Sequence, residues 1–225
     1  MIHNLIMSGG VAHDYQFTSK MLADILSKVD IESEITEDLG ILEEDRLQQF
    51  QVMTLNCVKW SCSQTPEWSD QSCEISPGQQ AGLLKFLASG KGLVAIHAAS
   101  INFDTWPEYG QILGGQWTWG RSSHGPYGLY KMHVENTHHP ITQHVSDFEI
   151  YDELYHTLSI TGDVDVLVTT VWEERVQPIV WTNTYGPSRI HYNALGHSPE
   201  SFECKPFQKL LCQGVLWASK GIWEK

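Results

Sequence analysis

Short apolar runs alternate with amphipathic segments along the first half of the chain. The runs read "NLIMSGG", "FQVMTLNCV" and "GLVAIHAAS", and each ends in small or polar residues. Runs of this kind, rich in Val, Ile and Leu, are typical of strands covered on both faces of a sheet. Between them, "TSKMLADILSKV" and "SPGQQAGLLKFLASGKG" place apolar residues three or four positions apart, which predicts two helices. Ser76 and Pro77 mark the start of the second helix.

The second half continues the alternation. The runs "VDVLVTTVW", "QPIVWTNTY" and "RIHYNALG" predict three more strands, and "KPFQKLLCQGVLWASKG" predicts a closing amphipathic helix. Alternating strands and helices predict an α/β fold with a mostly parallel sheet and helices on both faces. Two polar stretches, "DIESEITEDLGILEEDR" and "KWSCSQTPEWSDQSCEIS", are interpreted as solvated surface and loop. Because no linker or repeat divides the chain, we predict one domain over residues 1–225.

The composition argues against nucleic acid and membranes as partners. The chain has 27 acidic and 14 basic residues and a net charge of −13, which repels phosphate backbones and argues against a nucleic-acid partner. No stretch approaches the roughly 20 apolar residues of a membrane-spanning helix, so we expect no membrane partner. Five cysteines without a CxxC pair favour a reducing compartment. Since the start "MIHNLIMSGG" also lacks the features of a secretory leader, we predict a cytoplasmic protein.

Three histidines follow predicted strands. His13 comes after "NLIMSGG", His97 ends "GLVAI", and His197 follows "RIHYNALG". Ligands of open α/β sheets bind beyond the carboxyl ends of the strands. One histidine alone is more often a hydrogen-bonded structural or surface residue, but three at strand ends of one sheet predict a site. Neither GxGxxG nor a Walker-type phosphate loop occurs, so we expect no nucleotide or flavin.

Several motifs occur in a characteristic order: "GLVAIHAAS", "ILGGQW", "HHPIT", "YDELYH", "PIVWTNTYGPSRIHYNALGH" and "FQKLLCQGVLWAS". Together they resemble the trehalose-utilisation (ThuA-like) family, from about Leu5 to Ser219. The resemblance implies a flavodoxin-like α/β fold related to the class I glutamine amidotransferases. It also implies a role in sugar catabolism, with some members acting on 3-keto-glycosides. Residues 59–73 lie outside the familiar pattern and residues 116–130 fit it loosely, so we expect both segments to tune the substrate.

The kinship with amidotransferases gives His97 a particular position. In those enzymes a cysteine nucleophile occupies a tight strand-to-helix turn, and a later His and Glu complete a triad. The corresponding turn in this chain reads "AIHAAS", with His97 in place of the cysteine, while "GHSPES" supplies His197 and Glu200 near the partner positions. None of the five cysteines lies at that turn, so we expect no glutamine hydrolysis through a thioester.

Imidazoles at this edge allow two kinds of chemistry. In the first, His13, His97 and His197 bind a divalent metal such as zinc or manganese, with Glu153 as a neighbouring carboxylate, and the metal polarises a sugar carbonyl or hydroxyl. In the second, the same residues act as metal-free acids and bases. A ketone at carbon 3 of a sugar acidifies the hydrogen at carbon 2. Its removal lets the glycosidic oxygen at carbon 1 leave by β-elimination.

The remaining expectations concern individual residues. We predict four catalytic residues: His97, Glu153, His197 and His13. Five more are predicted to contact the substrate: His124, His139, Asp152, Trp106 and Tyr185. High aromatic content, with nine tryptophans, suits a platform for sugar faces. Tryptophans are also common at subunit interfaces, so a homodimer is a further expectation.

These expectations converge on one function with alternatives. We predict an enzyme of carbohydrate catabolism that cleaves an oxidised (3-keto) sugar or glycoside as a lyase or hydrolase. A keto-sugar isomerase or epimerase would use the same enolate. A non-catalytic sugar-binding module is the alternative from another class. Proton exchange at carbon 2 without cleavage distinguishes the isomerase, and binding with neither outcome distinguishes the module.

Overall fold

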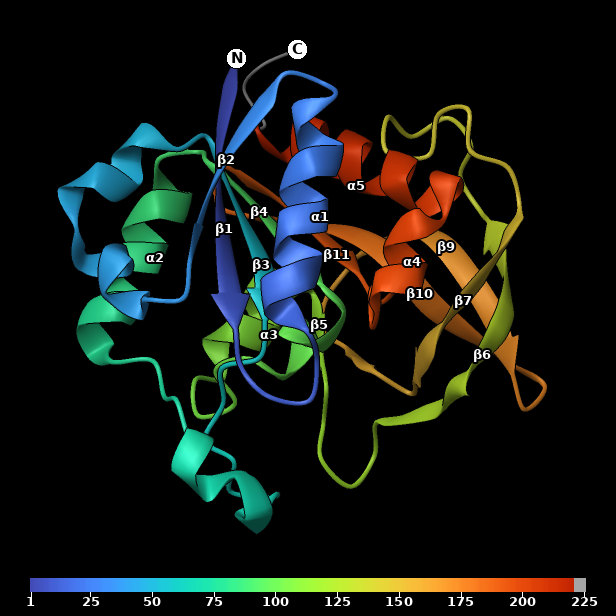
Figure 1. Ribbon diagram of the computed structural model, residues 1–225, viewed down its shortest axis with the longest axis horizontal. Coiled ribbons are helices and arrows are strands. Elements are labelled where there is room, and N and C mark those ends of the chain that lie inside the picture. The colour runs from blue at the N-terminus through green and yellow to red at the C-terminus, as the bar shows by residue number, and fades with distance from the viewer. Residues whose placement is uncertain (221–225) are drawn as a thin grey trace.

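The computed structural model describes residues 1–220, which fold around one sheet of nine strands (Figure 1). Five strands run parallel: β1 (Ile2–Gly9), β2 (Ile31–Thr36), β3 (Val52–Cys57), β4 (Gly92–Ile96) and β11 (Ser188–Asn193). Their order is β2-β1-β3-β4-β11, and every residue of β3 and β4 is buried. The predicted α/β fold is confirmed.

Four antiparallel strands extend this parallel half. They are β6 (Ser123–Val134), β7 (Phe148–His156), β9 (Asp165–Trp172) and β10 (Arg175–Tyr185). They continue the sheet from β11 in the order β10-β9-β6-β7. A separate two-stranded sheet joins β5 (Gly115–Gln116) to β8 (Ser159–Ile160). The runs predicted near the end of the chain are therefore strands, but only the last of them joins the parallel half.

Helices cover both faces of the sheet, as predicted. They are α1 (Tyr15–Ser27), α2 (Pro77–Ala88), α3 (Glu108–Leu113), α4 (Pro199–Glu203) and α5 (Lys205–Ala218). Figure 1 shows α1 and α5 together to the right of the parallel strands and α2 to their left. Side chains of β11 confirm this arrangement: Ser188 donates to Leu87 of α2, whereas His191 packs on Gly214 of α5.

The hydrophobic pattern missed both strands of the two-stranded sheet and three strands of the nine-stranded sheet. β2 lies inside the acidic stretch interpreted as solvated surface, because it is an edge strand with exposed Glu32 and only Ile31 fully buried. The hairpin of β6 and β7 also went unrecognised. β6 contains Gly and Pro and leaves Leu129 57% exposed, so its sequence lacks the apolar density of a central strand.

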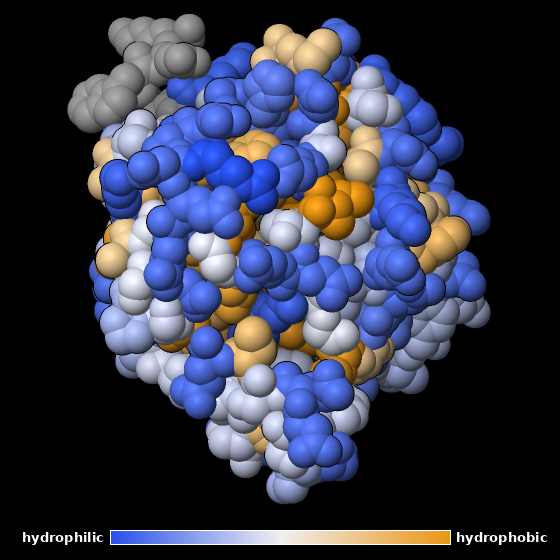
Figure 2. All heavy atoms as spheres, turned by 60° about the vertical axis from the view of Figure 1, so that its left-hand side comes forward, coloured by the Kyte–Doolittle hydropathy of each residue, from blue (hydrophilic) through white to orange (hydrophobic). Residues whose placement is uncertain are grey.

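The surface is largely hydrophilic on the face drawn in Figure 2. Figure 2 shows one face dominated by hydrophilic side chains, with hydrophobic residues in separate patches. Among the helices of residues 1–220, none combines the length and apolar character needed to cross a bilayer.

Candidate functional site

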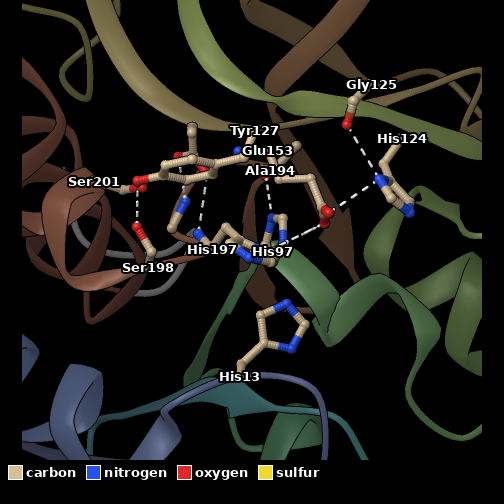
Figure 3. Close-up of polar contacts among 12 residues, drawn as sticks. His13, His97, His124, Gly125, Tyr127, Glu153, Ala194, His197, Ser198 and Ser201 are labelled. Atoms are coloured by element: carbon tan, nitrogen blue, oxygen red, sulfur yellow. Dashed lines mark hydrogen bonds and ion pairs between the residues drawn. The ribbon is translucent and has the colours of Figure 1, made fainter.

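Three histidines lie at the carboxyl ends of parallel strands, as the sequence predicts. His13 belongs to the loop between β1 and α1, His97 directly follows β4, and His197 follows β11 just before α4. Their ring centroids lie 4.7 to 5.3 Å apart. Figure 3 shows the His13 ring pointing toward the other two. The topology of the parallel half therefore brings residues about 85 and 100 positions apart in sequence into one cluster.

Glu153 of β7 completes the cluster. Its Oε2 lies 3.2 Å from His197 Nδ1 and 3.6 Å from His97 Nε2, while its Oε1 lies 2.9 Å from His124 Nδ1. The two histidine nitrogens, His197 Nδ1 and His97 Nε2, are 3.3 Å apart. Although β7 is the last strand of the sheet, the long hairpin it forms with β6 carries Glu153 to the ends of the parallel strands.

His97 is held in one orientation. Its φ of 48° lies in the left-handed region that few non-glycine residues adopt, and such strain is common at functional sites. Its Nδ1 donates to the carbonyl of Ala194 at 2.8 Å, and its ring packs on Tyr155 with centroids 4.0 Å apart. The Nδ1 proton leaves a lone pair on Nε2, which faces Glu153 and His197.

His13 carries a nitrogen without a partner. Its Nδ1 lies 3.1 Å from the Tyr15 hydroxyl and 3.3 Å from the Val11 carbonyl, but its buried Nε2 has no hydrogen bond to any described residue. Burial, together with the neighbouring His97 and His197, lowers the pKa of His13 to about 3. His13 is therefore neutral at physiological pH, with one ring nitrogen free to bind a ligand.

Glu153 and His197 stabilise each other's charge. Burial favours the neutral carboxyl, but the neighbouring imidazoles of His197 and His97 outweigh it and lower the pKa of Glu153. Burial likewise opposes the charged form of His197, yet the Glu153 carboxylate raises the pKa of that imidazole above its ordinary value. The site therefore holds a carboxylate among imidazoles in a half-buried setting.

Asp152, which was predicted to contact the substrate, lies beside the cluster and bonds to the backbone there. It is completely buried, and its carboxyl oxygens accept hydrogen bonds from the backbone N–H groups of Gly196, His197 and Glu153 at 2.8 to 3.0 Å. Burial raises the pKa of Asp152, against the effect of these donors. Asp152 thus joins the turn that carries His197 to the strand that carries Glu153.

The donor set fits a metal ion. In a tetrahedral zinc site with bonds of about 2.0–2.1 Å, two ligand atoms lie about 3.3 Å apart. The cluster places three ligand atoms 3.2, 3.3 and 3.6 Å apart, and one atom each of His13, His97, Glu153 and His197 lies within 4.8 Å of the others. Hydrogen bonds outside the cluster, from His97 to Ala194 and between His124 and Glu153, orient these groups as metal ligands are usually oriented.

A pocket of about 310 Å³ opens beside the cluster, and its wall includes His13, His124, Glu153 and His197. This volume lies at the small end of the range for ligand sites. The predicted substrate contact His124 therefore lies on the pocket wall. Glu200, by contrast, bonds to Ser198 and Tyr127, so the carboxylate in contact with the His197 ring is that of Glu153.

Three residues predicted to contact the substrate are not among the described residues that line this pocket. His139 packs on Trp217 with ring centroids 5.2 Å apart, away from the pocket wall. Trp106 is buried beside Tyr109. The hydroxyl of Tyr185 donates to Glu108. Each residue lies in or beside one of the family motifs in the sequence, but its side chain contacts residues outside the pocket lining.

The sequence analysis missed Tyr155. It predicted that tryptophans would contact the sugar but did not name the ones that line the pocket. Tyr155 lies two positions after Glu153 in a strand, so the two side chains share a face, and this alternation was a usable indication. Trp60 and Trp68 lie in the 59–73 segment that was expected to tune the substrate, and both line the pocket. Nothing in their local sequence separates them from the tryptophans of the core.

Comparisons with known proteins agree with this fold. A family model described as trehalose utilisation matches residues 4–218. A ThuA-like protein of Parabacteroides merdae is 22% identical, with 97% of this chain and 90% of that one covered and a TM-score of 0.81. One of Bacteroides uniformis is 20% identical, with 100% and 94% covered and a TM-score of 0.77.

A more distant structure, described as a GMP synthase protein of Thermoplasma acidophilum, is 12% identical, with 96% of each chain covered and a TM-score of 0.57. No curated protein sequence matches the chain. The chain has the glutamine amidotransferase-like fold and belongs to the trehalose-utilisation (ThuA) family.

Proposed function

We propose that this protein is an enzyme of carbohydrate catabolism that cleaves an oxidised (3-keto) sugar or glycoside by lyase- or hydrolase-type chemistry. The observation that carries the proposal is the convergence of three imidazoles and one carboxylate beside a pocket. The family description of trehalose utilisation supports a sugar as the substrate. A histidine at the turn where amidotransferases carry cysteine supports chemistry other than thioester formation.

The four residues of the cluster would hold a divalent metal, zinc or manganese. The unpartnered Nε2 of His13 and the ligand-like spacing of the other three donors support this assignment. When bound, the metal would act as a Lewis acid toward a sugar carbonyl. Metal-free acid–base catalysis by the same histidines is the alternative, and metal analysis of the purified protein separates the two.

His124 would move the proton in this reaction. Its Nδ1 lies 2.9 Å from Glu153 Oε1, so a proton on Nδ1 leaves Nε2 as the basic nitrogen, and its side chain is half exposed in the pocket. His124 Nε2 would take the proton from carbon 2 of a 3-keto-glycoside. The electron pair of that bond would form the double bond between carbons 1 and 2 as the bond from carbon 1 to the glycosidic oxygen breaks. The departing oxygen takes up a proton, and water addition to the double bond would complete a hydrolase.

The test is incubation of the purified protein with a 3-keto-glucoside in deuterated buffer. We expect cleavage by the wild type and a loss of at least about 100-fold in His124→Ala, in line with the contribution of a positioned acid or base. His139→Ala is the matched control and should cleave normally. Deuterium exchange at carbon 2 without cleavage would replace the proposal with the isomerase, and binding alone would replace it with the sugar-binding module.

A further inference from the structure

Four tryptophans form one wall of the pocket beside the cluster. Trp60 and Trp68 come from the segment after β3, and Trp117 and Trp119 come from the segment after α3. Within each pair the rings meet edge to face, with centroids 5.8 and 5.9 Å apart. Figure 1 shows the first of these segments, in teal, below the carboxyl end of β1.

The aromatic wall is continuous with the cluster. Trp117 packs on Tyr155 with ring centroids 4.9 Å apart, and Tyr155 packs on His97 with ring centroids 4.0 Å apart. A ligand whose reacting group lies at Glu153 would therefore have the rest of its body against aromatic rings.

Both tryptophan segments are anchored to residues 100–104, which follow the His97 turn. Asp104 accepts hydrogen bonds from the N–H and hydroxyl of Ser61 at 2.8 and 2.7 Å, and Asn102 accepts one from the Lys59 N–H at 2.6 Å. The N–H of Trp117 donates to the Ser100 carbonyl at 3.0 Å. The wall is therefore preformed, which lowers the entropy cost of binding a ring against it.

The chemistry of the wall restricts what it can bind. Among the described residues that line the pocket, none is Lys or Arg, so it offers no permanent cation to a phosphate group. Outside the cluster, the lining side chains that carry polar groups are those of His124, Thr65, Tyr155 and the four tryptophans, and the remaining side chains are apolar: Ala12, Val58, Ala98 and Ile101. A second sugar would bring several hydroxyls that lose water without gaining partners. An aromatic ring has no such cost.

We propose that this wall is a binding site for an aromatic leaving group, so that the substrates are unphosphorylated aryl glycosides. The inference rests on the proposed function only for the sugar part of the glycoside, and not for the leaving group. It concerns segments 59–73 and 116–130, which resemble the family least. The tryptophans would determine which glycosides are accepted, while the histidine cluster would act on the sugar.

The test measures binding of unoxidised ligands by calorimetry, since these need no turnover. We expect phenyl glucoside, in one of its two anomers, to bind about two- to tenfold more tightly than methyl glucoside, because one aromatic pair contributes a factor in that range. Trehalose, cellobiose and glucose 6-phosphate should bind more weakly than phenyl glucoside. Tighter binding of a disaccharide or of the phosphate would overturn the inference.

Variants localise the effect. Trp68→Ala should remove most of the preference for phenyl over methyl glucoside, and Trp68→Phe should retain part of it. Trp172→Ala is the matched control, because Trp172 is also half-buried but stacks on His156 outside the pocket. An unchanged preference in folded Trp68→Ala and in Trp119→Ala would overturn the inference.

A further variant separates this inference from the proposed function. His97→Ala should keep the preference for phenyl glucoside, since the wall does not include that side chain. Loss of cleavage with the preference retained leaves both proposals standing. Wild-type protein that shows the preference but never cleaves a 3-keto-glycoside overturns only the proposed function.

Discussion

The histidines that follow β4 and β11 differ from His191, within β11, in what surrounds their ring nitrogens. His97 and His197 have defined hydrogen-bond partners in the cluster, whereas the buried nitrogens of His191 have none among residues 1–220. His191 lies between β11 and Gly214 of α5, away from the pocket. It is therefore a structural histidine whose burial has consequences for stability but none for the site.

His191 should make the fold sensitive to acid. Burial lowers its pKa from 6.5 to about 3, so below pH 6.5 the unfolded chain takes up a proton that the folded chain refuses. The free energy of unfolding should fall by up to about 1.4 kcal/mol per pH unit from this group as the pH drops from about 6 toward 3. His191→Met, which cannot titrate, should show a shallower decline in urea unfolding between pH 7 and 4. If the free energy of unfolding of this variant fell with pH as steeply as that of the wild type, His191 would not be the group that makes the fold sensitive to acid.

Individual site residues were predictable where the strand end itself marks them. His13, His97 and His197 each follow an apolar run, and parallel strands bring their carboxyl ends to one edge. Trp106 and Tyr185 have no such marker. They lie in or near the family motifs in the sequence, but this does not determine which way their side chains point. Packing of Trp106 on Tyr109 is decided by contacts that local sequence does not encode.

Helix α5 approaches β11 closely because of one glycine. A Cβ added at Gly214 would lie 2.4 Å from His191 Cδ2, closer than side chains allow. This contact sets the distance between the closing helix and the sheet.

Gly214→Ala should therefore destabilise the protein although alanine favours helices. Overpacking costs about 1–3 kcal/mol, which exceeds the gain of up to about 1 kcal/mol in helix propensity. Gly128→Ala is the control, since its Cβ would meet nothing closer than 3.9 Å in β6. Urea unfolding should show a lower midpoint for the first variant and a midpoint near wild type for the second. A Gly214→Ala protein as stable as wild type would show that the helix moves freely.

Elements were predictable in proportion to their burial. β3 and β4 are buried on both faces and read as apolar runs, whereas β2, β6 and β7 lie at or near sheet edges and carry exposed polar residues. The hairpin of β6 and β7 matters most, because it brings Glu153 and His124 to the site. Its irregular register between His124 and Tyr127 reorients β6 where it passes the pocket.

The cluster connects the two halves of the sheet. His13, His97 and His197 follow parallel strands, while Glu153 belongs to the antiparallel extension. A metal held by all four would therefore join the halves and bind the folded chain alone.

Zinc should accordingly raise the melting temperature. At a zinc concentration about 100-fold above the dissociation constant, binding adds about 2.7 kcal/mol, which corresponds to roughly 5–10 °C for a chain of this size. Thermal unfolding with and without zinc, followed by addition of chelator, measures the shift. His13→Ala should lose most of it.

His133→Ala is the control for zinc bound elsewhere. His133 lies 2.9 Å from Asp147 and 4.0 Å from Glu135 on the exposed face of the antiparallel strands, so it is a separate group of potential ligands. The zinc shift should persist in His133→Ala. If this variant lost the shift and His13→Ala kept it, the metal would belong to the exposed group.

Alternation of apolar runs and amphipathic segments was enough to establish the α/β fold and to place three histidines at one edge, because both follow from local periodicity and the parallel direction of strands. The partners of those histidines depended on long-range packing. Glu153 reaches them through the hairpin of β6 and β7, and the two pairs of tryptophans line one pocket because two distant loops bind the same segment, residues 100–104. Contacts of that kind are set by the energy of the whole fold, and no stretch of sequence carries them by itself.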